Sequence, residues 1–119
     1  MFDFITEVPM NNEEMLRRGH NQAQTLARKI GLLANIPYLE SPIVRVPDTM
    51  AQHTLSAAKR YENVKNSYNL KDRASINGRI VLVDDVVTTG ATLHRCSALL
   101  RSCGAQEVFC LTASTTPIR

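Results

Sequence analysis

The chain has 119 residues, of which 44% are apolar and 21% charged, and its formal net charge is +3. This length and balance predict a single globular domain, residues 1–119, and exclude an intrinsically disordered chain. The weak positive charge does not indicate direct nucleic-acid binding, and no apolar run is long enough to span a membrane.

The N-terminal sequence and the cysteines indicate a cytoplasmic protein. Residues 1–7 contain acidic side chains and no basic cluster, which does not fit a signal peptide. The chain has an odd number of cysteines, namely Cys96, Cys103 and Cys110. None of them has the C-x-x-C spacing of a zinc site. We therefore expect free thiols that pack as small buried hydrophobic side chains.

The first half of the chain predicts a strand, a helix and a second strand. Residues 2–8 form the first strand, which stops at Pro9. Asn21 begins the helix as its N-cap, with Gln24 as the capping-box partner, and Pro37 ends it. Residues at helical spacing predict its buried face: Ala23, Leu26, Ala27, Ile30 and Leu33. Residues 43–46 form the second strand.

The second half of the chain continues the alternation. Residues 56–68 have the spacing of a helix, and residues 80–83 read as a strand buried on both faces. A further helix begins near Leu93 and stops at Gly104, followed by a strand over residues 107–113. The apolar side of this helix is expected to consist of Leu93, Cys96, Leu99, Leu100 and Cys103. The alternation predicts an α/β fold, a Rossmann-like parallel sheet flanked by helices.

The chemistry-bearing segment follows the buried strand at residues 80–83. Asp84 and Asp85 come where that strand ends, and ligands bind at the carboxyl ends of parallel strands. Two adjacent carboxylates can accept hydrogen bonds from the vicinal hydroxyls of a ribose. Taken separately, an Asp-Asp pair is usually a solvated turn, but here it lies between a buried strand and a helix start.

The residues after the acidic pair predict a phosphate-binding loop. They offer backbone N–H groups, three hydroxyls and the positive end of the following helix. Gly90 allows the backbone to approach an anion without a Cβ in the way. The loop residues are Val87, Thr88, Thr89, Gly90, Ala91 and Thr92. Together with Asp84 and Asp85, the loop has about the length of a ribose 5-phosphate.

Residues 81–92 resemble the phosphoribosyl-pyrophosphate signature of the type I phosphoribosyltransferases. The resemblance implies the core fold of that superfamily, a catalytic role for Asp84 and Asp85 on the ribose hydroxyls, and a 5-phosphate site on residues 87–92. It implies displacement at C1 of phosphoribosyl pyrophosphate by a nitrogen nucleophile. Mg²⁺ is the expected cofactor, held mainly by the substrate, with Asp84 and Asp85 as possible ligands.

A wider part of the chain, about residues 3–113, is similar to the ComF branch of that superfamily, which is associated with DNA uptake in competence. The matching positions are Val8, Pro9, Met10, residues 17–23, Leu26, Ala27, Gln52, Leu55, Arg60, Asn63, Val64, Gly104, Ala105 and Val108. His20 replaces the usual Phe, and residues 11–14 are more acidic than the branch. The branch usually carries an N-terminal four-cysteine zinc module, so we expect a fragment, a shortened product or a partner on another chain.

Three arginines are candidate ligands for the phosphate groups of phosphoribosyl pyrophosphate other than the 5-phosphate. Arg17 and Arg18 lie near the expected pyrophosphate loop, and the alternative is a solvated basic face. Arg60 ends a stretch, residues 45–60, that resembles the flexible loop closing over the site in related transferases. The alternative for that stretch is an ordinary surface connection.

Three functions compete at this point. The first is a phosphoribosyltransferase with an unidentified acceptor. The second is a catalytically silent phosphoribosyl-nucleotide-binding module that acts through a competence-machinery protein partner. The third, a DNA-binding accessory protein, ranks last because no concentrated basic and aromatic surface is evident. By resemblance alone, a homodimer is expected.

Overall fold

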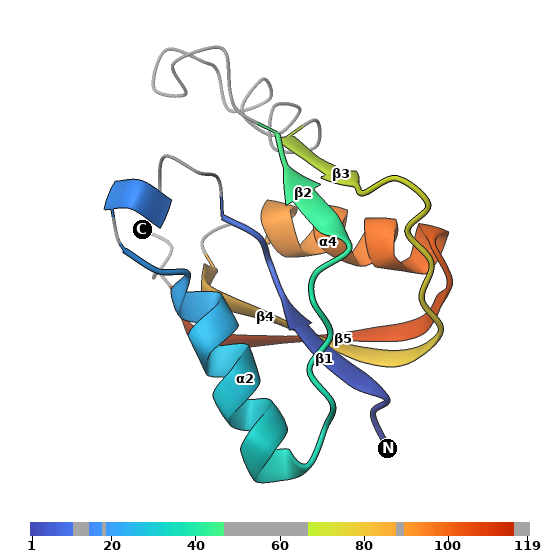
Figure 1. The fold of residues 1–119 in the computed structure, drawn as a ribbon, viewed down its shortest axis with the longest axis horizontal. Helices are drawn as coiled ribbons and strands as arrows, with labels where there is room; N and C mark the ends of the chain where they lie inside the picture. Colours follow the sequence, from blue (N-terminus) through green and yellow to red (C-terminus); the bar gives the residue numbers. More distant parts are fainter. Residues whose placement is uncertain (11–14, 18, 47–66, 88–89, 116–119) are drawn as a thin grey trace.

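A computed structural model of the chain describes residues 1–10, 15–17, 19–46, 67–87 and 90–115 (Figure 1). Its central sheet contains β1 (Phe4–Glu7), β4 (Gly78–Val87) and β5 (Ala105–Thr115) in the order β1-β4-β5. Both pairings are parallel, so the predicted α/β fold with a parallel sheet is confirmed. The segment after the first helix extends the sheet, because Ile5 N donates to Pro37 O at 3.0 Å and Leu39 N to Ile5 O at 2.9 Å.

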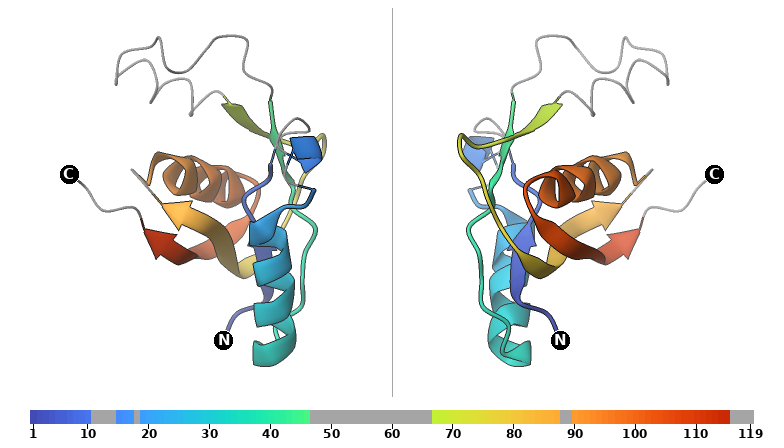
Figure 2. Two further views of the ribbon diagram at one scale, coloured as in Figure 1. Left: turned by 90° about the vertical axis from the view of Figure 1, so that its left-hand side faces the viewer. Right: turned by 90° about the vertical axis from the view of Figure 1, so that its right-hand side faces the viewer.

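The two helices, α2 (Gln22–Ala34) and α4 (Ala91–Ser102), cover opposite faces of the sheet (Figure 2). Ile80 and Leu82 pack with the buried residues of α4, whereas Val81 and Val83 pack with Ala27 of α2. Because successive strand residues point to opposite faces, the unbroken aliphatic run of β4 is buried on both sides, as predicted.

A second, antiparallel pair of strands packs with α4. It consists of β2 (Ile43–Arg45) and β3 (Tyr68–Leu70), with Arg45 directly opposite Tyr68. The strand predicted at residues 43–46 is confirmed as β2. The helix predicted over residues 56–68 is wrong at Tyr68, which lies in β3, and the rest of that range up to residue 66 lies outside the described residues. Tyr68 is only 4% exposed, because it packs in the core beside α4.

Helix α2 begins and ends with asparagine. Asn21 is the predicted N-cap: its Oδ1 accepts the backbone N–H groups of Ala23 and Gln24. The predicted capping box is wrong, because the Gln24 side chain instead donates to Glu7 and to Tyr38. Asn35, with a left-handed backbone, caps the other end, so the helix stops before Pro37.

Packing of α2 against β1 depends on a glycine. A Cβ at Gly31 would lie 2.8 Å from the carbonyl oxygen of Ile36 and 3.1 Å from Cγ2 of Ile5. The helix therefore approaches the strand more closely than an alanine would allow. The expected burial of Leu33 is wrong, since its side chain is 89% exposed beyond the edge of the packed face.

The buried side of α4 is as predicted for four of its five positions: Leu93, Cys96, Leu99 and Leu100 are buried. Cys103 is half-buried at the C-cap, and Gly104 follows it with φ +125°. The three thiols are free, as expected, but Cys110 is exposed rather than buried. It lies on β5, the edge strand of the described sheet, and its Sγ is 3.3 Å from Ser97 Oγ of α4.

Candidate functional site

Asp84 and Asp85 lie inside β4 rather than after it. The predicted strand stopped at residue 83, whereas β4 continues to Val87 and pairs Asp84 with Thr112 of β5. Acidic residues are uncommon in strands, which is why the sequence placed the boundary before them. Pairing with β5 carries the strand past the acidic pair, so the sheet itself fixes the backbone of both aspartates.

Strand alternation directs the two aspartates to different faces. Asp84 follows Leu82 on the α4 face, and Asp85 follows Val83 on the α2 face. The two residues are nevertheless linked, because Asp85 N donates to Asp84 Oδ1 at 2.9 Å. Burial, reinforced by the hydrogen bond and charge of Asp85, raises the pKa of Asp84 to about 6.

The surroundings of Asp84 include a buried phenol and a buried thiol. Burial raises the pKa of Tyr68 to about 12 and that of Cys96 to about 12, and the charge of Asp84 contributes to both shifts. Tyr68 and Cys96 are therefore neutral near pH 7. Arg45 Nη1 donates to Tyr68 Oη at 3.0 Å. The sequence did not identify Tyr68 as a neighbour of the acidic pair.

The amino end of α4 has the features of an anion site. Gly90 is the N-cap with φ +79°, and a Cβ at this position would meet no atom of the described residues within 4 Å, its chain neighbours aside. In contrast to Asn21 of α2, Gly90 has no side chain with which to accept the first N–H groups of its helix. The helix starts at Ala91, two residues before the predicted Leu93.

The remaining loop residues are described only in part. Ala91 and Thr92 occupy the first turn of α4, with half-buried side chains. Val87 is the last residue of β4. Thr88 and Thr89 lie outside the described residues. The structure thus brings the acidic pair and the helix start together at one edge of the sheet, as the sequence predicts.

Of the three candidate arginines, the structure describes only Arg17. Arg17 is exposed, and residues 15–17 lie on the side of the molecule toward which β4 and β5 run (Figure 1). Arg18, Arg60 and the expected lid after residue 46 lie outside the described residues. Asn21 is engaged as a cap, and its Nδ2 donates to Val8 O at 3.2 Å. This bond ties the start of α2 to the end of β1.

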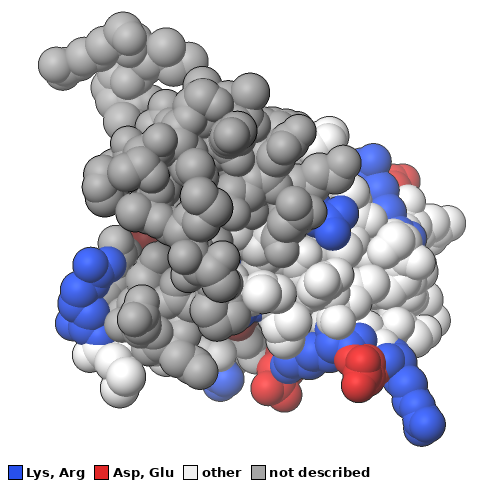
Figure 3. All heavy atoms as spheres, turned by 90° about the horizontal axis from the view of Figure 1, so that it is seen from above, with Lys and Arg blue, Asp and Glu red and all other residues white. Residues whose placement is uncertain are grey.

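Other parts of the described chain show no competing site of this kind. In the described ranges, no group of three or more His, Cys, Asp or Glu side chains is placed to hold a metal ion. The described helices are too short or too polar to cross a membrane. On the face shown in Figure 3, basic and acidic side chains are interspersed over the part that is not grey.

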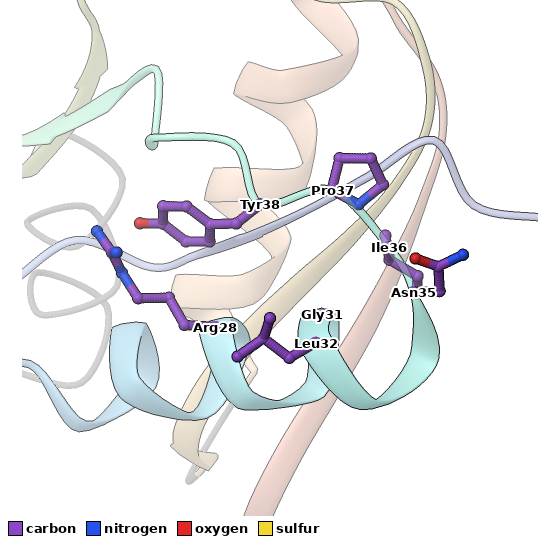
Figure 4. Close-up of a pocket in the computed structure, with 7 residues that line it drawn as sticks. All are labelled: Arg28, Gly31, Leu32, Asn35, Ile36, Pro37 and Tyr38. Carbon is purple, nitrogen blue, oxygen red and sulfur yellow. The ribbon is translucent and has the colours of Figure 1, made fainter.

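A pocket lies away from the predicted site residues. It has a volume of about 440 Å³ and is formed by the second half of α2 and the segment that follows it. Figure 4 shows Arg28 and Tyr38 at one end of it and Asn35 at the other. The Arg28 guanidinium carbon lies 4.5 Å from the centre of the Tyr38 ring. None of the predicted phosphate or ribose ligands lines this pocket.

Comparison with known proteins places this geometry in a family context. A family model described as "Phosphoribosyl transferase domain" matches residues 15–118. "Competence protein F" of Haemophilus influenzae is 40% identical over 107 residues, which cover 87% of this chain and 46% of that protein. "DNA utilization protein YhgH" of Escherichia coli K12 is 37% identical over 112 residues, covering 92% and 48% respectively. The chain therefore spans about half the length of these curated relatives.

The fold is also similar to that of a solved transferase. Glutamine phosphoribosylpyrophosphate amidotransferase from B. subtilis, in complex with ADP and GMP, aligns with a TM-score of 0.61 and 26% identity. The alignment covers 95% of this chain and 22% of the amidotransferase chain. The similarity therefore extends over the sheet, both helices and the edge that carries Asp84 and Asp85.

Proposed function

Because the chain belongs to the phosphoribosyl transferase domain family, and within it to the ComF type, we propose that it binds phosphoribosyl pyrophosphate and transfers the 5-phosphoribosyl group to a nitrogenous acceptor. One observation carries this proposal. The family match covers a strand that holds two partly buried aspartates and then a helix whose N-cap is Gly90 in a left-handed conformation.

The acidic pair is proposed to bind the ribose hydroxyls. Asp84 and Asp85 lie on a paired strand, and both side chains are partly exposed to solvent. An ionised carboxylate only accepts hydrogen bonds, so it complements the two hydroxyl donors of a ribose. The raised pKa of Asp84 keeps its charge sensitive to what binds beside it.

The amino end of α4 is proposed to bind the 5-phosphate. Its first N–H groups and the helix dipole favour an anion. Gly90 supplies the left-handed backbone, and without a Cβ it allows the backbone to approach the phosphate oxygens. Thr92, in the first turn, adds a hydroxyl donor. The ribose and phosphate sites then lie on the same strand–loop–helix unit.

The reaction would be displacement at C1 of the sugar. The acceptor nitrogen forms a bond to C1 as the C1–O bond to pyrophosphate breaks, and the electron pair of that bond leaves with pyrophosphate. The protein's contribution is to position the sugar and to stabilise charge, rather than to form a covalent intermediate. Asp84 and Asp85 would hold the ribose while its ring oxygen takes on positive charge.

Magnesium is proposed as the cofactor. When bound, Mg²⁺ would neutralise charge on the departing pyrophosphate. Mg²⁺ prefers oxygen ligands and keeps several waters, and one or two carboxylates together with substrate phosphates suffice to hold it. Asp84 and Asp85 fit this requirement as adjacent, partly buried carboxyl groups at the proposed site.

A second candidate is a phosphoribosyl-nucleotide-binding module without turnover, acting through a protein partner. The names of the curated relatives motivate this candidate, because they refer to competence and DNA utilization. Such a module would use the same aspartates and the same helix start. The two candidates differ only in whether pyrophosphate is released.

Calorimetric titration with phosphoribosyl pyrophosphate, with and without Mg²⁺, tests the shared part of both candidates. We expect saturable binding that Asp84→Asn/Asp85→Asn abolishes. A folded wild-type chain that fails to bind would refute the ligand assignment. Pyrophosphate release is then measured with a panel of nitrogenous bases. Release with at least one base supports the transferase, and binding without release supports the module.

A further inference from the structure

Strand β5 forms a long edge of the described sheet. It runs over 11 residues, Ala105–Thr115, and in the described sheet it pairs with β4 on one side only. The opposite edge, β1, is continued by the segment at Tyr38, which forms a parallel bridge to Ile5. Edge strands usually avoid pairing with other chains through short length, charges, proline or bulges. In β5 the one charged residue is Glu107, proline is absent, and the register shift against β4 lies at its first residues.

The centre of β5 carries two apolar side chains that solvent reaches. Phe109 is 40% exposed and Leu111 is 42% exposed. Their partners in β4 are Val81 and Val83, which α2 covers, so both side chains lie on the α2 face of the sheet. The Phe109 ring is held in place, because it packs edge to face on the Phe2 ring with the ring centres 4.9 Å apart. An exposed apolar pair at the centre of an unprotected edge marks an interaction surface.

The sequence of β5 is complementary to itself. A two-fold axis places the same strand of two copies side by side and antiparallel. When this axis passes through Cys110, the midpoint of the strand, all 11 residues pair. Phe109 then lies opposite Leu111 of the second copy, and such apolar cross-strand pairs stabilise a sheet. Glu107, the only charge of the strand, lies opposite Ala113, so no like charges meet.

We propose that the chain forms a homodimer in which β5 pairs antiparallel with β5 of a second copy, in the register centred on Cys110. The two sheets then become one, in the order β1-β4-β5-β5-β4-β1. Because the axis reverses the strand direction, Asp84 and Asp85 of the two copies lie toward opposite ends of the joined sheet. Each copy therefore keeps its own candidate site, and the dimer does not depend on the ligand assigned to that site.

Sedimentation velocity of the full chain under reducing conditions tests the dimer. Protein at up to about 0.1 mM covers interfaces of micromolar affinity. Leu111→Lys places a charge opposite Phe109 and should weaken the dimer about a hundredfold, about tenfold for each of its two copies. Leu32→Lys is the matched control and should leave the dimer unchanged, because Leu32 is an exposed leucine of α2 that lines the pocket at the edge opposite β5. Thiol reagents should label Cys110 rapidly in the dilute monomer and more slowly as the dimer forms.

Disulfide trapping tests the register. Glu107→Cys and Ala113→Cys are introduced separately into a chain whose Cys103 and Cys110 are replaced by serine. Residues directly opposite in an antiparallel pair have Cα atoms about 4.5–5.5 Å apart, which a disulfide can join. A mixture of the two variants should therefore form a disulfide-linked heterodimer on mild oxidation. Each variant alone should not, since its two introduced cysteines lie about six residues, or about 20 Å, apart along the paired strands.

Three outcomes overturn this dimer. A wild-type chain that stays monomeric at about 0.1 mM leaves β5 to a different partner. A dimer that Leu32→Lys weakens and Leu111→Lys does not is formed through α2. Disulfides that are absent from the mixture, or that form as readily in each variant alone, exclude the register centred on Cys110. The trapping variants keep Phe109 and Leu111, so they decide the register even if circular dichroism shows that Leu111→Lys is unfolded.

Discussion

The backbone N–H of Asp85 donates to the Asp84 side-chain oxygen Oδ1 at 2.9 Å, inside a strand that β5 holds in register. One carboxylate is therefore held by the backbone of the next acidic residue. Two neighbouring acids on a partly buried strand repel each other when both are ionised. This arrangement lowers stability, and it makes sense where a ligand with hydroxyl donors binds.

Asp84→Asn should stabilise the free protein at pH 7.5. Burial and Asp85 raise the pKa of Asp84 from 3.8 to about 6, so the folded state favours the protonated acid. The resulting stabilisation is present below about pH 4 and is lost as the pH rises through about 6. Asparagine keeps the Oδ1 acceptor and carries no charge. We expect a gain of about 1 kcal/mol, since solvent screens part of the effect, or ~4 °C in Tm.

The control for this variant is the same melting experiment at pH 4. There the wild-type aspartate is already largely protonated in the folded state, so the difference in Tm should shrink. An Asp84→Asn protein that is less stable than wild type at pH 7.5, with no change between the two pH values, would contradict the raised pKa.

Affinity for ribose 5-phosphate should decrease below about pH 6. A protonated Asp84 loses an acceptor for a ribose hydroxyl, so binding weakens as the pH falls through its pKa of about 6. The second ionisation of a phosphate monoester also lies near pH 6. Titrations of wild type and Asp84→Asn from pH 5 to pH 8 separate the two effects. The variant should retain only the phosphate-dependent part, and identical profiles would refute the role of Asp84.

Gly90 and Gly104 should respond differently to alanine. Both have positive φ, but a Cβ at Gly104 would overlap the carbonyl oxygen of Ile76, whereas a Cβ at Gly90 enters open space. We expect Gly104→Ala to cost about 3 kcal/mol in the free energy of unfolding and Gly90→Ala about 1 kcal/mol. Urea denaturation measures both costs.

In affinity for ribose 5-phosphate, the two variants should rank in the opposite order. Gly90→Ala places a methyl group where the 5-phosphate is proposed to lie, so it should abolish ribose 5-phosphate binding in a protein that is still folded. Folded Gly104→Ala protein, examined at low temperature, should bind normally. Wild-type affinity in Gly90→Ala would place the phosphate elsewhere.

The three cysteines should react with thiol reagents at different rates. Cys110 is exposed on β5, whereas Cys96 is buried and its pKa is raised to about 12 by burial. Cys103 is half-buried, and burial raises its pKa as well. In the native protein we expect one fast thiol, which Cys110→Ser removes. Labelling of Cys96 should require denaturant, and fast native labelling of Cys96 would contradict the packing of α4 on the sheet.

The sequence alone determined the features that depend on local pattern. The aliphatic run at residues 80–83 predicted a doubly buried strand, and the spacing of Leu93, Cys96 and Leu99 predicted the packed side of α4. Asn21 predicted the start of α2, because its side chain caps N–H groups only two and three residues away. The order of acidic pair, loop and helix predicted the edge of the sheet at which the candidate site lies.

Tertiary structure decided what depends on partners distant in the sequence. Pairing with β5 places Asp84 and Asp85 within β4, and pairing with β2 makes Tyr68 part of a strand. The exposure of Leu33 and Cys110 depends on where the covered faces of the sheet end. Periodicity along a chain reports which residues share a face. Only the arrangement of the elements decides whether that face is covered and which side chains meet, as Arg45 and Tyr68 do across the β2–β3 pair.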